Sequence, residues 1–327
     1  MEQRSLGKTG RSVSAIGLGT WQLGADWGEV SEADALAVLE ESVAAGVTFF
    51  DTADVYGDGR SERFIRTFRE RNPEQNVFVA TKIGRRLEQL PENYSRENFT
   101  AWVDRSRTNL GVDTLDLVQL HCPPSAVYTD QRVFDALDEL VEKQAIAAYG
   151  VSVEESAQAL TAIERPGLSS VQIILNPFRL KPLDEVLPAA LAHDVGIIAR
   201  VPLASGLLSG KYTADTVFPE NDHRTYNRNG EAFDRGETFS GVDFADGLAA
   251  AQEFAAALPE GVSVPQAALR WLIDQPGVTA AIPGARNVRQ ALANAGAADL
   301  PRTSPELDAR VHEIYDRYFR ATVHPQW

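Results

Sequence analysis

The feature that most constrains the fold is a regular alternation of short apolar runs with helical stretches. Eight runs, each bounded by Gly, Pro or polar residues, are apolar enough to be buried on both faces. They cover residues 15–18, 48–50, 77–80, 115–120, 146–151, 170–174, 196–199 and 279–282. Parallel strands need a crossover of about a dozen residues or more, usually a helix, and the chain supplies one each time. Eight such units favour a closed barrel over an open doubly wound sheet.

Helical periodicity fills the stretches between these runs. Ser31 is a typical N-cap residue ahead of an apolar face that includes Leu36 and Leu39, and Gly46 ends that stretch. Similar patterns cover residues 95–110, 130–143, 153–162 and 288–295, with a turn-rich hairpin over 5–13 and a terminal helix over 304–319. A chain of 327 residues also has room for two mid-sized domains. The continuous pattern favours an α/β fold, a single (β/α)8 TIM barrel domain over 1–327 with an N-terminal β-hairpin and a C-terminal helix.

The segment 211–244 departs from this pattern. It follows the seventh run, is polar and rich in Asn, Arg and Gly, and has little periodicity. Loops of this length inside a compact domain are usually functional or mobile. A surface insertion is the alternative, but the position after a strand favours a loop over an active site.

The amino-acid composition limits the classes of partner that the protein can bind. With 46 acidic against 31 basic residues the formal net charge is −15, which opposes binding to nucleic acid or to an anionic membrane. Cys122 is the one cysteine, so no intramolecular disulfide is possible, and the sequence shows neither a secretory signal nor an apolar run near 18 residues. We expect a cytoplasmic protein, a monomer or weak homo-oligomer, that acts on a small molecule.

Polar residues end three consecutive runs. In a β/α barrel the carboxyl ends of the strands face the active site. Asp51 ends the second run, Lys82 follows the third and His121 follows the fourth. Side chains alternate along a strand, so Lys82 and His121 point the same way as barrel-filling neighbours. A buried ammonium group needs a partner, and Asp51 on the adjacent strand is the nearest candidate.

These residues carry a specific resemblance. Asp51-x4-Tyr56, followed by Lys82 and then His121, resembles the catalytic tetrad of the aldo-keto reductase family. Further words match it in collinear order from about residue 4 to about residue 294: Gly17-Leu18-Gly19-Thr20-Trp21, Phe50-Asp51-Thr52-Ala53-Asp54-Val55-Tyr56-Gly57, Gln119-Leu120-His121, Gly150-Val151-Ser152, Pro202-Leu203-Ala204-Ser205-Gly206, and Ile282-Pro283-Gly284-Ala285.

The resemblance implies reduction of aldehydes and ketones by hydride transfer from NADPH, with Tyr56 as proton donor. A free tyrosine titrates near pH ~10, and an ammonium group within hydrogen-bond reach lowers that value. Lys82 would therefore lower the pKa of Tyr56, Asp51 would keep Lys82 charged, and His121 would donate a hydrogen bond to the substrate carbonyl.

The resemblance also places the cofactor. The chain has neither G-x-G-x-x-G after its first run nor a P-loop. The family binds NADP(H) across the barrel mouth instead, and by motif the expected contacts are Thr20, Trp21, Asp51, Ser152, Gln172, Arg200, Pro202, Leu203, Ser205, Gly206, Lys211, Arg224, Gly284, Arg286, Gln290 and Asn294. Arg286 or Arg289 would take the 2′-phosphate, because arginine matches a phosphate bidentately. Surface charge is the alternative for Arg224 and Arg289.

Two positions depart from the family pattern. Val153 stands where many members have Asn, and Arg200 stands where many have an aromatic residue that stacks on the nicotinamide. A guanidinium group can stack on a ring as well. The alternative for Arg200 is a salt-bridged residue at a strand end.

Other interpretations remain open. Taken singly, Asp51 and Lys82 are more often a structural ion pair, Tyr56 a loop aromatic and His121 a core histidine. Thiol catalysis by Cys122 is doubtful because adjacent strand residues point to opposite faces. No metal site is expected.

Two rival functions have different chemistry. One is an aldolase that uses Lys82 as a Schiff base, which an ion pair with Asp51 opposes. The other is a non-catalytic NADP-binding regulatory module such as the potassium-channel β-subunits of this family, which carry Asn in place of His121. Trp21, Trp27, Tyr56 and Trp327 suggest an apolar rim for hydrophobic or aromatic substrates, with sugar-like or inositol-like substrates left open.

Overall fold

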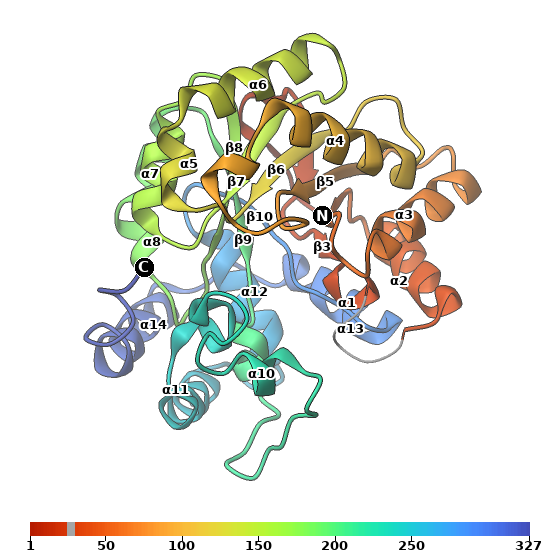
Figure 1. Cartoon of the computed structure of the whole chain (residues 1–327). Coiled ribbons are helices and arrows are strands. Elements are labelled where there is room, and N and C mark those ends of the chain that lie inside the picture. Colours follow the sequence, from red (N-terminus) through yellow and green to blue (C-terminus); the bar gives the residue numbers. More distant parts are fainter. Residues whose placement is uncertain (25–29) are drawn as a thin grey trace.

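Eight parallel strands form one curled sheet in the computed structural model, which describes residues 1–24 and 30–327 (Figure 1). The strands are β3 (Leu18–Gly19), β4 (Phe49–Asp51), β5 (Phe78–Ile83), β6 (Leu117–His121), β7 (Tyr149–Ser152), β8 (Leu168–Ile174), β9 (Gly196–Arg200) and β10 (Val278–Ala281). They pair in chain order from β3 to β10. Bridges from Ile16 to Ala281 and from Gly19 to Gly284 join the first strand to the last. The sheet therefore closes into the predicted (β/α)8 barrel.

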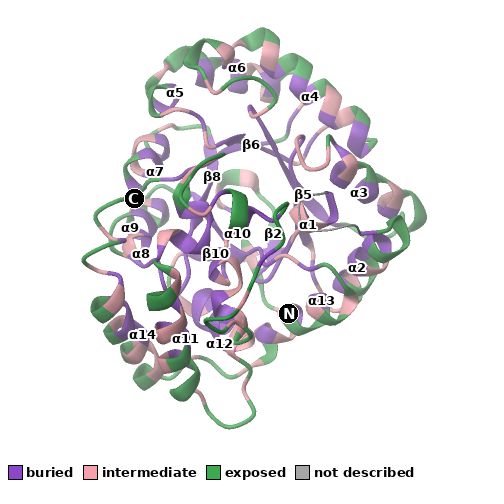
Figure 2. Ribbon diagram, turned by 60° about the horizontal axis from the view of Figure 1, so that its bottom comes forward, coloured by how far each residue is buried: buried purple, intermediate pink, exposed green. Residues whose placement is uncertain are grey.

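Helices surround the sheet. They are α1 (Trp21–Gly24), α2 (Glu32–Ala44), α3 (Arg60–Arg71), α4 (Arg96–Leu110), α5 (Ser125–Thr129), α6 (Gln131–Glu142), α7 (Ser156–Ile163), α8 (Lys181–Asp184), α9 (Val186–Ala192), α10 (His223–Tyr226), α11 (Phe244–Ala256), α12 (Val264–Asp274), α13 (Val288–Ala295) and α14 (Pro305–Tyr318). Figure 2 shows buried residues along the strands and the inner helix faces, and exposed residues on the outer faces. Among the described residues, no helix is long and apolar enough to span a membrane.

The N-terminal hairpin closes one end of the barrel. It pairs β1 (Gln3–Ser5) with β2 (Ser12–Ser14) in antiparallel register, as predicted. Leu6 and Val13, both fully buried, belong to the same apolar cluster as the barrel-filling side chains Phe49 and Phe78. Gly7 has φ +47°, and a Cβ there would lie 2.3 Å from the Ser169 carbonyl oxygen, so this close approach requires glycine. The carboxyl ends of the strands are left as the open mouth.

All eight predicted runs overlap a strand, but several strands extend further than their runs. The run 77–80 overlaps β5, which begins at Phe78 and continues to Ile83, and the run 115–120 overlaps β6, which begins at Leu117 and ends at His121. Apolarity stops at Thr81 and Lys82, whereas the ladder pairing does not. The polar residues of the site are thus part of the strands themselves.

The helix predictions were incomplete. Ser31 and Ser95 cap α2 and α4 as expected, through backbone N–H groups of Asp34 and Asn98. The stretch predicted over 153–162 begins instead at Ser156. Four of the longer helices, α3, α9, α11 and α12, were not predicted, and neither were the short helices α1, α5, α8 and α10. Most residues of α3 are charged, and its apolar face consists of only three buried side chains, Phe64, Ile65 and Phe68.

The segment 211–244 follows β9 and contains α10 and two short 3-10 turns, η4 (Arg235–Glu237) and η5 (Phe239–Gly241). It lies beside the mouth of the barrel, as expected for a loop over the site, and several of its residues line the cavity described below. Its inner side packs as an aromatic cluster in which Arg228 lies 5.0 Å from the ring centroid of Phe239.

Candidate active site

A single cavity of about 1210 Å³ extends across the mouth of the barrel. At one end it is lined by Asp51, Tyr56, Lys82 and His121. From there it passes the turn after β9 and reaches α13. The residues of the proposed tetrad, taken from four separate segments, therefore meet in one place.

The register of the sheet explains this convergence. Lys82 on β5 is opposite Gln119 on β6, and His121 on β6 is opposite Ser152 on β7. Asp51 ends β4, opposite Ala80. Because alternate side chains share a face, these polar residues all point into the upper end of the barrel.

Lys82 is the centre of the hydrogen-bond network. Its Nζ donates to Asp51 Oδ1 at 2.5 Å, to the Thr52 carbonyl oxygen at 2.9 Å and to the Tyr56 hydroxyl oxygen at 3.4 Å. These three bonds use the full donor capacity of an ammonium group. Lys82 is 1 % exposed, so the charge is buried only because it is paired.

Two glutamines hold the other oxygen of Asp51. Gln172 Nε2 donates to Asp51 Oδ2 at 2.7 Å and Gln119 Nε2 does so at 3.2 Å. Gln172 was predicted as a cofactor contact; it lines the cavity, but its amide group is engaged with Asp51. Gln119 was not predicted. The alternation that places Lys82 on the inner face includes it.

The pKa of Tyr56 differs from expectation. Burial raises it above the ordinary value, and the Lys82 ammonium group opposes this without reversing it. The prediction that Lys82 lowers the pKa of Tyr56 was right about the direction of that one interaction and wrong about the net result. Burial also lowers the pKa of Lys82, but Asp51 and Tyr56 more than offset it, so the net pKa is raised. At neutral pH the pair is a neutral phenol beside an ammonium ion.

His121 is held in its neutral form. Burial lowers its pKa well below the ordinary value, and the positive charges of Arg85, Lys82 and Arg200 add to this. Its ring lies 6.0 Å from that of Tyr56, centroid to centroid, at an interplanar angle of 83°. Nδ1 is buried and has no hydrogen-bond partner among the described residues. A neutral imidazole carries one N–H, which is available for a hydrogen bond to a ligand.

The residues predicted to contact a cofactor line the same cavity, with one exception. The lining includes Trp21, Asp51, Ser152, Gln172, Arg200, Pro202, Leu203, Ser205, Gly206, Lys211, Arg224, Gly284, Arg286, Gln290 and Asn294. The exception is Thr20, which is fully buried outside the lining and whose hydroxyl donates to the Asp51 carbonyl oxygen at 2.9 Å. Thr20 supports the strand end and does not face the cavity.

Arg200 forms salt bridges at the end of its strand, as the alternative to stacking on the nicotinamide predicted. Its Nη2 lies 2.6 Å from Glu154 Oε2 and 3.0 Å from the Val153 carbonyl oxygen, and Nη1 lies 3.8 Å from Glu237 Oε1. It still lines the cavity, and its buried Nε has no partner among the described residues. The ion pairs and the position in the cavity are compatible with each other.

Arg224 is also paired within its own segment. Its Nη2 lies 2.5 Å from Asp222 Oδ2, and it donates to the Tyr212 hydroxyl group. Gly206, in the turn after β9, has φ +95°, and a Cβ there would lie 2.2 Å from the Tyr212 hydroxyl oxygen. Glycine is thus required where Tyr212 closes over the turn.

Sequence reasoning missed a charged cluster beside His121. Arg85 Nε donates to the His121 carbonyl oxygen at 3.2 Å, and Arg85 Nη2 lies 2.9 Å from Glu237 Oε1 and 3.4 Å from Glu154 Oε1. Arg85 lies three residues after Lys82, close enough to the site to have been considered. Glu237, in the segment 211–244, carried no signal of its own.

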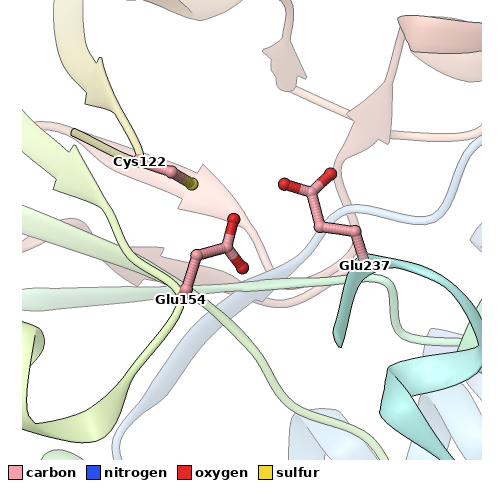
Figure 3. A group of neighbouring side chains, drawn as sticks. All are labelled: Cys122, Glu154 and Glu237. Carbon is pink, nitrogen blue, oxygen red and sulfur yellow. The ribbon is translucent and has the colours of Figure 1, made fainter. Parts of the chain in front are cut away.

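Cys122 takes part in this cluster. Its backbone has φ +49°, so it no longer follows the strand alternation, and it lines the cavity together with His121. The argument that places it on the opposite face was therefore wrong. Its Sγ lies close to carboxylate oxygens of Glu154 and Glu237 (Figure 3). Burial raises the pKa of the thiol to about 12, so it is not a ready nucleophile.

The same three side chains are near enough to share a metal ion. Both carboxylates already pair with guanidinium groups, Glu154 with Arg200 and Glu237 with Arg85. These guanidinium groups already neutralise the charge of the carboxylates, and the protonated thiol is a poor ligand. The chemistry of the cluster therefore favours an ion-pair network.

The predicted apolar rim is only partly formed. Trp21 and Tyr56 line the cavity and stack, with ring centroids 6.0 Å apart. Trp327 is elsewhere: its Nε1 donates to Asp234 Oδ1 at 3.0 Å and its ring covers Gly241. Trp27 lies outside the described residues. His223 was not predicted, and its ring lies 5.3 Å from that of Trp21.

Comparison with known proteins decides the family. The family model described as "Aldo/keto reductase family" matches residues 15–316. The chain belongs to the aldo/keto reductase family. Membership covers nearly the whole barrel, including every segment that contributes to the cavity.

Relatives in this family differ in role. The chain is similar to aldo-keto reductase YhdN of Bacillus subtilis, 31 % identical over 294 residues, which cover 89 % of this chain and 86 % of the relative. It is 29 % identical to the NADP(+) aldo-keto reductase yakc of Schizosaccharomyces pombe, over 95 % of this chain and 90 % of that one. It is also 29 % identical to a probable voltage-gated potassium channel subunit beta of Oryza sativa subsp. japonica, over 96 % of each chain.

A solved structure supports the fold. The glycerol dehydrogenase AKR11B4 of Gluconobacter oxydans superimposes with a TM-score of 0.80 at 28 % identity, over 99 % of this chain and 98 % of that one. The barrel is thus the fold of an oxidoreductase family.

Proposed function

We propose that this chain, acting as one domain over residues 1–327, reduces aldehydes and ketones to alcohols with NADPH. The observation that carries the proposal is the contact of Lys82 Nζ with both the Tyr56 hydroxyl oxygen, at 3.4 Å, and Asp51 Oδ1, at 2.5 Å, in a cavity that His121 also lines. A phenol next to a paired ammonium ion is suited to give a proton to a carbonyl oxygen.

The proton step follows from the charges of these residues. Tyr56 is neutral at pH 7 because burial keeps its pKa high, so it holds the proton that reduction requires. When that proton moves to the carbonyl oxygen, the phenolate left behind lies beside the Lys82 ammonium group, which stabilises it. Asp51 keeps Lys82 charged and in place. NADPH, when bound, supplies the hydride that adds to the carbonyl carbon.

His121 acts on the other side of the carbonyl group. A neutral imidazole donates one hydrogen bond and adds no charge that would repel Lys82. The donated bond polarises the carbonyl and strengthens as negative charge develops on its oxygen. The low pKa of His121 preserves this role across the physiological range.

The residues of the cavity suit a dinucleotide. The turn after β9 has positive φ at Ala204, Ser205 and Gly206, a backbone conformation whose N–H groups form anion-binding concavities. Further along, the cavity is lined by Arg286 and Arg289 near the start of α13. A helix N-terminus and arginine side chains both favour phosphate groups. The name of the Schizosaccharomyces pombe relative, which states NADP(+), agrees with this assignment.

The two rival functions are less consistent with the site. A Schiff base needs an uncharged amine, whereas the pKa of Lys82 is raised and all three of its donors are used. The potassium-channel relative favours a regulatory module only by similarity. His121, neutral and lining the cavity, supports catalysis.

The test is NADPH oxidation by the purified chain, followed at the nicotinamide absorbance with a panel of aldehydes and ketones. The proposal expects substrate-dependent oxidation with at least one member of the panel. Tight NADPH binding without turnover on any of them would favour the regulatory module. Trapping of substrate on Lys82 by borohydride in the absence of cofactor would favour the aldolase.

A further inference from the structure

Four charged side chains form ion pairs between the segments that surround His121. Arg85 follows β5, Glu154 follows β7, Arg200 ends β9 and Glu237 belongs to the segment 211–244. Their charged atoms lie 2.6 Å to 3.8 Å apart in the pairs described above. Of the four, Arg200 and Glu237 line the cavity. The segment 211–244 thus delivers a carboxylate group to the wall of the cavity.

Three observations place Glu237 at the reacting end of that cavity. Its ion-pair partner Arg85 donates to the His121 carbonyl oxygen. Cys122, the residue after His121, has its Sγ within 4.8 Å of a Glu237 carboxylate oxygen. The negative charge of Glu237 also acts to raise the pKa of Tyr56. Glu237 therefore lies near enough to the tetrad to meet a substrate bound there.

Glu237 keeps its negative charge in this position. Burial raises its pKa, but Arg85 and Arg200 outweigh burial and lower the pKa to about 2. Its neighbour Glu154 has a pKa raised by burial to about 7, so it is the member of the pair that takes up a proton. The wall thus presents one ionised carboxylate.

The carboxylate retains capacity for a further hydrogen bond. Both guanidinium contacts of Glu237 are made to Oε1. Glu154, the member of the pair that takes up a proton, also hydrogen-bonds to Glu237. A carboxylate has about four lone-pair positions on its two oxygens, so these three partners do not saturate it. The wall therefore offers a hydrogen-bond acceptor.

The opposite side of the same end is aromatic. Trp21 and Tyr56 are stacked at an interplanar angle of 21°, and both line the cavity. An aromatic face suits the C–H groups of a substrate, and a charged wall suits its hydroxyl groups. A purely hydrocarbon substrate would leave the charged wall without hydrogen-bond partners, which costs free energy.

We propose that Glu237 is a specificity-determining residue whose carboxylate accepts a hydrogen bond from a hydroxyl group close to the reacting carbonyl. The inference rests on the proposed reductase function and narrows its substrate class to hydroxylated aldehydes and ketones. Carbonyl compounds that bear a carboxylate group are disfavoured, because Glu237 repels them and holds both arginines.

The test uses two aldehydes with the same three-carbon skeleton, glyceraldehyde and propanal. For each, kcat/KM is measured by NADPH oxidation with the wild-type chain, Glu237→Gln and Glu237→Leu. Each aldehyde is hydrated to the same extent whichever variant is assayed. A change between variants in the ratio of the two kcat/KM values therefore reports the side chain. Glu231→Gln is the matched control, because Glu231 lies in the same segment and is exposed.

Removal of the charged acceptor is expected to lower the glyceraldehyde-to-propanal ratio by about tenfold or more in Glu237→Leu. Glu237→Gln, which keeps an acceptor oxygen but loses the charge, is expected to lower it less. Glu231→Gln is expected to keep the wild-type ratio. If Glu237→Leu does not fold, as judged by its thermal melting, the Gln variant alone decides.

An unchanged ratio in the folded Glu237 variants overturns the inference. That result leaves the reductase function standing. Failure of the wild-type chain to oxidise NADPH with any aldehyde or ketone contradicts the proposed function itself, and this inference with it.

Discussion

Each residue of the tetrad is defined by its partners. Asp51 is held by Lys82 on one oxygen and by Gln119 and Gln172 on the other. This threefold support fixes the carboxylate and, through it, the ammonium group. Asp51, Lys82 and His121 were predicted from the sequence as polar residues at successive strand ends, and Tyr56 was predicted from the family resemblance. The supporting role of the two glutamines was not predicted, because a glutamine in a strand has no distinctive pattern.

The protonation states lead to a prediction for the pH profile. Reduction uses the neutral phenol of Tyr56, which is the form present below its pKa, and that pKa is raised. His121 is neutral above its own pKa, which lies well below the ordinary value. We therefore expect kcat for reduction at saturating NADPH to be flat from about pH 6 to about pH 9 and to fall only at higher pH.

Steady-state kinetics across this range in buffers of constant ionic strength provide the check. A limb in kcat between about pH 6 and pH 8 that disappears when His121 is replaced by Asn would contradict the assigned state of the imidazole.

At the scale of elements, the loop between β4 and α3 carries both Tyr56 and an unusual buried acid. Asp54 is fully buried and neither of its carboxylate oxygens has a hydrogen-bond partner among the described residues. Burial raises its pKa to about 7, the charge of Glu62 adds to this, and Arg86 and Arg105 oppose it. The loop is therefore less stable when Asp54 is ionised.

Replacement of Asp54 by Asn tests this. The folded pKa is about 7 against 3.8 for the free group, so the wild-type chain loses stability as pH rises through that window. The loss is at most about 4 kcal/mol, since each pKa unit is worth about 1.4 kcal/mol. Asp54→Asn, close in shape and without a charge, should not show it. Urea unfolding at pH 5 and pH 8 measures the difference, and equal pH dependence in both chains would show that Asp54 is not responsible.

The cofactor end of the cavity depends on α13 and the turn that precedes it. Arg286 and Arg289 were predicted under the family resemblance as candidates for the 2′-phosphate, and both line the cavity. In the sequence alone they are two of many arginines. Only the fold separates them from surface charge.

Removal of both arginines should weaken NADPH binding and spare NADH binding, because only NADPH carries the 2′-phosphate. The double variant Arg286→Ala/Arg289→Ala is expected to lose roughly tenfold or more of its preference for NADPH, measured by tryptophan fluorescence titration with each cofactor. Arg132→Ala, an exposed arginine on α6, is the control. An unchanged preference in the double variant would place the phosphate elsewhere.

On the scale of the whole molecule, the barrel was the most predictable part. Buried parallel strands must be apolar and must be followed by crossovers, so they leave a repeated pattern that covers the chain. Helices such as α3 have a weaker sequence pattern, because three apolar residues suffice to hold a charged helix against the sheet. Of the cluster around Glu237, only the pairing of Arg200 was anticipated as an alternative, since the members lie far apart in the sequence and meet only once the barrel closes.

Closure of the barrel also makes its two ends different. The hairpin with Leu6 and Val13 fills one end of the barrel, and the polar strand ends, with the segment 211–244 beside them, form the other. Membership in the aldo/keto reductase family is consistent with chemistry at that open end. The central claim is that the Tyr56 phenol, beside Lys82, gives the proton that completes carbonyl reduction.

The most direct test of that claim is the turnover of Tyr56→Phe, with Tyr318→Phe on α14 as the matched control. The account predicts that Tyr56→Phe still binds NADPH, as seen by tryptophan fluorescence, and loses about 10²-fold to 10⁴-fold in kcat for aldehyde reduction, whereas the control keeps wild-type turnover. A folded Tyr56→Phe chain that reduces aldehydes at the wild-type rate would contradict it.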